Sequence, residues 1–104
     1  MRLACFLVLV SIAACCGAAP PPRPARLGLC AACHGEDGRA RIAGAPNLAG
    51  QNESYLLKAL HDYRSGARDV AVMRAATGPL SEAELQALAK WYASLPCTPG
   101  SATP

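Results

Sequence analysis

The chain has 104 residues and a formal net charge of +3, with ten lysines and arginines against seven aspartates and glutamates. These charges form no basic run, which argues against a nucleic-acid surface, and the length leaves room for one domain. So short a domain buries little apolar surface, and only one tryptophan, three tyrosines and one phenylalanine are available. Disulfides, metals or prosthetic groups often supplement such a core.

The first 19 residues have the pattern of a signal peptide, in which an arginine precedes an apolar run over residues 3–14. About a dozen apolar residues are too few to span a bilayer, which takes roughly 20. The sequence IAAC that ends at Cys15 resembles a bacterial lipobox, which predicts a lipoprotein anchored to a membrane through Cys15. The alternative is ordinary cleavage after Ala18 or Ala19. Both interpretations predict a periplasmic location.

Composition divides the remaining chain into three parts. Residues 17–26 are rich in proline and predict an extended tether. Residues 27–96 are expected to fold, and residues 97–104 have the composition of a flexible tail. If Cys15 carries a lipid, Cys16 and Cys97 both remain in the mature chain, and either a disulfide between them or two free thiols fits the sequence.

The first element expected in the folded part is a short helix over residues 24–32, which ends before the helix breakers Gly35 and Gly38. A loop over residues 35–51 follows it. Such a loop is long for a domain of about 70 residues, and loops of this length usually carry function or wrap around something.

A second helix is predicted over residues 52–65, with Asn52 as its N-cap and Gly66 as its stop. Its apolar residues recur at helical spacing, at Leu56, Ala59, Leu60 and Tyr63. A second long loop is expected over residues 67–80.

The last predicted helix has the best local signals. Ser81 and Glu84 form a capping box, and Pro96 ends the helix. Its apolar stripe consists of Leu85, Leu88, Ala89, Tyr92 and Leu95. No segment of the chain shows sustained two-residue alternation, so the predicted fold class is all-α.

The segment CAACH, residues 30–34, carries the chemistry of the predicted site. C-x-x-C-H is the attachment signature of a c-type haem, in which each thiol adds to a vinyl group and the histidine becomes an axial ligand of the iron. Cys30 and Cys33 lie one helical turn apart and therefore reach neighbouring vinyl groups, while His34 projects toward the ring centre. The sequence predicts one heme c, covalently attached through both cysteines.

Two other kinds of site use paired cysteines. A redox disulfide usually lies between a strand and a helix, and no strand pattern is present. A zinc site needs a further ligand, which Cys97 or His61 would have to supply, and neither belongs to a second cysteine pair. The haem interpretation is favoured over both.

Met73 is the predicted second axial ligand. It is the only methionine that remains after the signal is removed, and it lies in the loop before the last helix. The alternative is a core methionine that fills a gap. His61 would instead give a bis-histidine iron, but it lies on a polar helix face beside Lys58 and Asp62, which favours a solvated surface histidine.

Several separated segments together resemble the class I bacterial cytochromes c, in particular the small monohaem branch that includes cytochrome c-four and c-five. The segments are CAACHGEDG, PNLAGQNESYLLKAL, YRSGARD and LSEAELQALAKWYASL, with Met73 before the last. They occur in the family's order between about residues 27 and 96. The resemblance implies three to five short helices wrapped around one covalent haem, in an electron-transfer protein rather than an enzyme.

The resemblance also implies a set of haem-binding residues in this chain. His34 and Met73 would ligate the iron, and the backbone carbonyl of Pro46 would accept a hydrogen bond from the free ring N–H of His34. Three further residues would line the pocket. The implied set is Cys30, Cys33, His34, Pro46, Leu48, Tyr55, Leu60 and Met73.

An iron with both axial positions filled has no site for a substrate, so its chemistry is one-electron transfer at the haem edge. Thioether ligation and a pocket of low dielectric raise the reduction potential relative to bis-histidine ligation. We therefore expect an electron donor to a terminal oxidase, a peroxidase or another periplasmic reductase of a respiratory chain. The alternative is a haem-based domain that binds or senses a gas or peroxide, with a labile distal ligand.

The expected partners are redox proteins, namely an oxidase, a dehydrogenase or a reductase, and a tethered domain that serves a single partner enzyme also fits the sequence. Four cations form a candidate docking patch, although an ordinary solvated face is favoured. They are Arg64, Arg68, Arg74 and Lys90.

Overall fold

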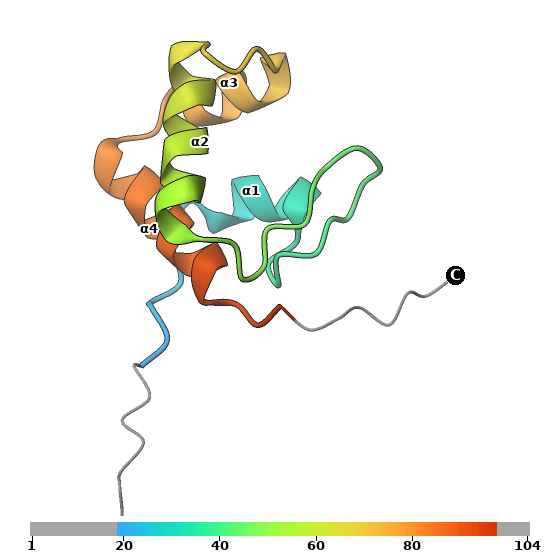
Figure 1. The fold of residues 1–104 in the computed structure, drawn as a ribbon, viewed down its shortest axis with the longest axis vertical. Coiled ribbons are helices and arrows are strands. Elements are labelled where there is room, and N and C mark those ends of the chain that lie inside the picture. Colours follow the sequence, from blue (N-terminus) through green and yellow to red (C-terminus); the bar gives the residue numbers. More distant parts are fainter. Residues whose placement is uncertain (1–18, 98–104) are drawn as a thin grey trace, which may run out of the picture.

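The computed structural model describes residues 19–97, which form four α helices and no strand (Figure 1). The helices are α1 (Leu27–His34), α2 (Glu53–Ser65), α3 (Ala71–Thr77) and α4 (Glu82–Ser94). The predicted all-α class is confirmed. Within the described range, no helix has the length and apolar character that crossing a membrane requires. The predicted signal peptide with Cys15 and Cys16, and the tail after Cys97, lie outside the described residues.

The two long helices, α2 and α4, begin at side-chain caps and pack against each other. The Asn52 side chain accepts a hydrogen bond from the Tyr55 amide at 3.0 Å. Ser81 accepts one from the Glu84 amide at 3.2 Å, and the Glu84 carboxylate accepts one from the Ser81 amide at 2.9 Å. Gly66 ends α2 in the left-handed conformation. Both predicted helices are therefore confirmed to within one residue.

The first helix begins and ends later than its sequence predicts. Pro24 lies in a turn in which its carbonyl accepts a hydrogen bond from the Leu27 amide, and Arg26 has a non-helical backbone with ψ of 5°. The helix then continues through His34. Gly35, with φ of 76°, ends it directly afterwards.

The described part of the predicted tether contacts the domain. Pro24 is buried, Arg23 pairs with Glu36 at 2.7 Å, and Arg26 pairs with Glu84 at 3.0 Å. Because both ion pairs are exposed, each contributes little to stability. A domain boundary at residue 27 remains a prediction, and the structure adds contacts on its N-terminal side.

The segment expected to be a loop over residues 67–80 contains α3, so that expectation was wrong for residues 71–77. Its sequence AVMRAAT is rich in alanine, the best helix former. Seven residues make fewer than two full turns, too few for the apolar periodicity that identifies a helix. α3 packs against α2, and in the view of Figure 1 it lies on the same side of α2 as α1, toward the other end.

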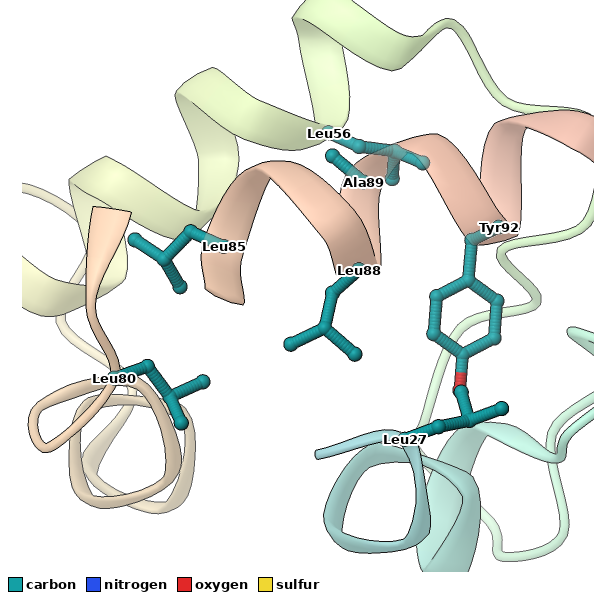
Figure 2. Packing of buried hydrophobic residues seen from close by; sticks show 7 residues of the cluster. All are labelled: Leu27, Leu56, Leu80, Leu85, Leu88, Ala89 and Tyr92. Carbon is teal, nitrogen blue, oxygen red and sulfur yellow. The ribbon is translucent and has the colours of Figure 1, made fainter. Parts of the chain in front are cut away.

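The apolar core is one cluster to which α4 contributes most of the buried side chains. Figure 2 shows the Tyr92 ring extending from α4 toward Leu27 on α1. The apolar stripe predicted for α4 is confirmed, with Leu95 partly buried at its end. The members of the cluster are Leu27, Leu56, Leu80, Leu85, Leu88, Ala89 and Tyr92.

Candidate functional site

His34, the last residue of α1, is buried, with 7% of its surface exposed. Its Nδ1 lies 2.9 Å from the backbone carbonyl oxygen of Pro46. Because a carbonyl only accepts hydrogen bonds, Nδ1 carries the ring proton and donates it. Nε2 is then the nitrogen whose lone pair is available to a metal. This hydrogen bond is the one that the family resemblance implied for Pro46.

Cys30 and Cys33 lie one turn apart on α1, directly before His34. Both are half-buried free thiols. Burial raises the pKa of the Cys30 thiol, so this side chain is protonated at neutral pH. Two thiols and an imidazole therefore lie on one short helix, and two of the three are only half covered by protein.

The loop after His34 turns back toward α1 at two glycines. A Cβ on Gly35 would clash with the Arg39 carbonyl oxygen, and one on Gly38 would lie 2.6 Å from the Ala49 nitrogen. Both glycines have φ of 76°, a region that favours glycine. The Gly38 carbonyl accepts hydrogen bonds from the amides of Leu48 and Ala49. These contacts return the chain to α1 and bring Pro46 to His34.

Met73 is half-buried on α3 and comes from a different element than His34. Its backbone carbonyl accepts a hydrogen bond from the Thr77 hydroxyl at 2.8 Å, and Thr77 is buried. Met73 belongs neither to the buried cluster nor to the side chains packed against it. The structure therefore does not support the alternative of a core methionine.

The three predicted pocket residues differ in their surroundings. Leu48 and Leu60 are partly buried against the apolar cluster. Tyr55, near the start of α2, has 52% of its surface exposed. The structure thus places two of the three at the edge of the core and the third outside it.

His61 is engaged elsewhere on the surface. Its Nε2 donates to the Glu82 carboxylate at 2.8 Å, and Arg64 donates to the same carboxylate at 3.1 Å. In the part of the chain that the structure describes, no group of three or more histidine, cysteine, aspartate and glutamate side chains is arranged to hold a metal ion. This arrangement gives the zinc and bis-histidine alternatives no support.

The four cations of the candidate docking patch are mostly engaged within the domain. Arg64 pairs with Glu82, Arg74 pairs with Asp69 at 2.8 Å, and the Arg68 guanidinium lies 4.9 Å from the centre of the Tyr63 ring. An ordinary solvated face describes them better than a patch of free charge.

The donor set fits a c-type haem. Two thiols lie one helical turn apart, and the adjacent imidazole holds its proton on the nitrogen that faces Pro46. The sequence model of the family described as cytochrome c matches residues 28–96. The chain belongs to the cytochrome c family.

Cytochrome c4 of Pseudomonas aeruginosa is 41% identical over 80 residues, which cover 77% of this chain and 40% of that protein. The thiosulfate dehydrogenase electron acceptor of Thiomonas intermedia is 46% identical over 79 residues, covering 75% of this chain and 35% of that protein. The crystal structure of reduced recombinant cytochrome c4 from Pseudomonas stutzeri superposes with a TM-score of 0.59 at 35% identity, covering 64% of this chain and 37% of that one.

This cytochrome c domain carries one heme c, attached through Cys30 and Cys33, as the sequence predicted. The helical fold is likewise that of a cytochrome c. Membership of this family indicates electron transfer as the role of the domain. The chain spans about two fifths of the length of the cytochrome c4 relatives that it matches.

Sequence reasoning missed two residues near this site. It assigned Tyr92 to the core and gave Trp91 no role. The structure shows hydrogen bonds from both side chains to the turn after His34. More than fifty positions separate the partners in sequence, so no local pattern indicates the contacts.

Proposed function

We propose that this cytochrome c domain is a periplasmic one-electron carrier whose iron is ligated by His34 and Met73. When bound, the haem supplies an iron that alternates between the ferric and ferrous states. The observation that carries the proposal is the hydrogen bond from His34 Nδ1 to the Pro46 carbonyl, because it orients the ring and leaves Nε2 for the metal.

Pro46 acts on the strength of the imidazole ligand as well as on its orientation. A carbonyl that accepts a hydrogen bond from Nδ1–H makes the opposite ring nitrogen a better electron donor. Burial of His34 keeps water from competing for that hydrogen bond. The chain therefore presents a fixed imidazole before any partner is involved.

Met73 supplies the contrasting ligand. Its thioether is soft and stabilises the reduced iron, which raises the reduction potential relative to a second imidazole. The packing of α3 on α2 and the Thr77 hydrogen bond hold the Met73 backbone. Leu48, Tyr55 and Leu60 would cover the ring and keep water away from it, which raises the potential further.

We expect this ligation to give a positive reduction potential, which indicates the partners of the domain. A carrier with a positive potential donates electrons to a terminal oxidase, a peroxidase or another periplasmic reductase. The relative named as a thiosulfate dehydrogenase electron acceptor, at 46% identity, supports a dehydrogenase as the source of the electrons. Attachment to a membrane through a lipid on Cys15 remains a prediction.

The test is an absorption spectrum of the haem-loaded protein in both oxidation states, with and without carbon monoxide. We expect the near-red sulfur-to-iron band when the protein is oxidised, and no change when the gas is added to the reduced protein. Met73→Ala should abolish the band and bind carbon monoxide. His61→Ala is the matched control and should retain the wild-type spectrum, because His61 is paired with Glu82.

Two outcomes would contradict the proposal. A sulfur-to-iron band that persists in Met73→Ala would exclude Met73 as the ligand. Ready binding of carbon monoxide by the wild-type protein would favour the domain that binds or senses a gas or peroxide.

A further inference from the structure

Two neighbouring aromatic residues near the end of α4 reach the turn that follows His34. The Tyr92 hydroxyl donates to the Gly35 carbonyl at 2.9 Å, and the Trp91 indole N–H donates to the Glu36 carbonyl at 3.1 Å. Two successive carbonyls directly after the histidine are therefore held by side chains of one helix.

The backbone of this turn has considerable conformational freedom to lose. Gly35 has φ of 76° and ψ of 150°, and glycine has the largest conformational entropy of any residue. Its amide donates to the Ala31 carbonyl at 2.9 Å and so belongs to α1. Its carbonyl is held by Tyr92. Because each peptide unit is planar, these two hydrogen bonds restrict both dihedral angles of Gly35.

Tyr92 also holds the far end of the same loop. The Gly50 amide donates to the Tyr92 backbone carbonyl at 3.0 Å. One residue of α4 thus binds the loop where it leaves α1 and where it returns toward α2. Pro46, whose carbonyl orients the His34 ring, lies between these two points.

The Tyr92 hydroxyl is a permanent donor in this arrangement. The residue is buried, with 3% of its surface exposed. Burial, with smaller contributions from Cys30, Glu36 and Asp37, raises the pKa of Tyr92 well above its ordinary value. Once Cys30 is a thioether its contribution disappears, but burial remains, so the phenol keeps its proton.

We propose that Tyr92, together with Trp91, is a positioning residue of the haem site: the two side chains fix the turn after His34 and, through the loop that carries Pro46, the orientation of the imidazole toward the iron. The inference rests on the proposed ligation by His34. In this proposal, α4 helps to orient the His34 ligand through two side-chain hydrogen bonds, in addition to its apolar packing in the core.

The experiment compares Tyr92→Phe and Trp91→Phe with Tyr63→Phe in the haem-loaded protein. Tyr63→Phe deletes the same hydroxyl from a tyrosine on α2 for which the structure shows no phenol hydrogen bond among residues 19–97. Three properties are measured: the hyperfine-shifted proton resonances of the His34 ring in the oxidised protein, the reduction potential, and the exchange rates of two loop amides. These are the Arg41 amide, which donates to the Cys33 carbonyl on α1, and the Leu48 amide, which donates to the Gly38 carbonyl.

We expect Tyr92→Phe to displace the His34 resonances, to change the potential, and to speed exchange of the two amides about tenfold, since a buried carbonyl loses its partner. Trp91→Phe should produce smaller changes of the same kind, because Trp91 is only half-buried and its carbonyl partner is more exposed. Tyr63→Phe should change none of the three. If Tyr92→Phe does not fold, the comparison of Trp91→Phe with Tyr63→Phe in the same three properties tests the proposal.

A variant that melts at a lower temperature but keeps the wild-type His34 resonances and potential would overturn the proposal, since Tyr92 would then act on stability alone. Wild-type protein without hyperfine-shifted imidazole resonances would instead overturn the ligation by His34, and with it the present inference. The wild-type spectrum therefore separates the two failures.

Discussion

The two pairs of helices in this cytochrome c domain differ in what defines them. α2 and α4 have thirteen residues each, begin at side-chain N-caps and pack against each other. α1 and α3 have eight and seven residues and no side-chain cap, and Leu29 and Val72 on them are 51% and 68% exposed. Helices this short are marginal on their own. Local sequence defines the first pair, whereas the second pair depends on tertiary contacts.

The long helices mainly stabilise the fold, whereas the short helices carry the residues of the haem site. The long pair supplies most of the apolar core, while the short pair carries both cysteines, His34 and Met73. α1 is tied in by the loop hydrogen bonds around Gly38, by the α4 aromatic residues, and by covalent attachment to the haem, whereas α3 is held by its packing on α2. Changes to each pair should therefore be detected by different measurements.

The largest effect is expected on the haem-bearing side. Replacing both Cys30 and Cys33 by alanine removes every thioether bond, so all covalently bound haem should be lost. The pyridine haemochrome spectrum of the acid-acetone-extracted protein measures this directly. Cys97→Ala is the matched control, because Cys97 is an exposed free thiol outside α1, and it should keep full haem content. Haem that resists extraction from the double variant would contradict the assignment.

A core substitution tests the long pair. Leu88 on α4 is 1% exposed, so Leu88→Ala should lower the free energy of unfolding by about 3 kcal/mol through lost burial and a residual cavity. Urea unfolding at matched haem content measures the change. Lys90→Ala, at an exposed position of the same helix, should stay within about 0.5 kcal/mol of wild type. Equal losses in the two variants would show that α4 does not anchor the core.

A smaller loss is expected when the start of α4 is altered. Ser81→Ala removes the side-chain acceptor of the Glu84 amide and should cost about 1 kcal/mol. Ser94→Ala, at the other end, removes only an exposed hydrogen bond to the Trp91 carbonyl, and its cost should be a few tenths of a kcal/mol. The same urea titration measures both costs. A larger cost for Ser94→Ala than for Ser81→Ala would argue against Ser81 as the N-cap that stabilises the start of α4.

The smallest effect concerns acid stability at the contact between α2 and α4. Glu82 accepts hydrogen bonds from His61, Gln86 and Arg64, and the bond from His61 contributes most to lowering the pKa of Glu82. The carboxylate therefore stabilises the fold above the unfolded-state pKa of about 4.3, and this stabilisation is lost as the pH falls through the lower folded-state pKa. Because the group is exposed, the change is modest.

Melting temperatures measured between about pH 6 and pH 3 test this expectation. The midpoint of Glu82→Gln should fall less steeply with acidification than that of wild type. Glu53→Gln is the control, since no ion pair of Glu53 is seen within residues 19–97, and its profile should run parallel to wild type. If the melting temperatures of both variants changed with pH in parallel with wild type, Glu82 would not contribute to the loss of stability in acid.

The sequence by itself determined the features that depend on residues within one or two turns of each other. The C-x-x-C-H segment identified the haem attachment, the box between Ser81 and Glu84 placed the start of α4, and Asn52 and Gly66 bounded α2. Each of these signals is local, since caps and ligand spacing act through the neighbouring backbone. The hydrogen bond between His34 and Pro46 came from the family resemblance, because nothing in the intervening residues specifies it.

Only the tertiary structure decided the remainder. α3 is too short for a periodic signal, so its position became visible only where it packs on α2. Tyr92 and Gly35 are 57 positions apart, and Trp91 and Glu36 are 55 apart. Such pairs meet because burial of the α4 stripe brings its end against α1, and a hydrogen bond made after that packing leaves no pattern in the order of the residues.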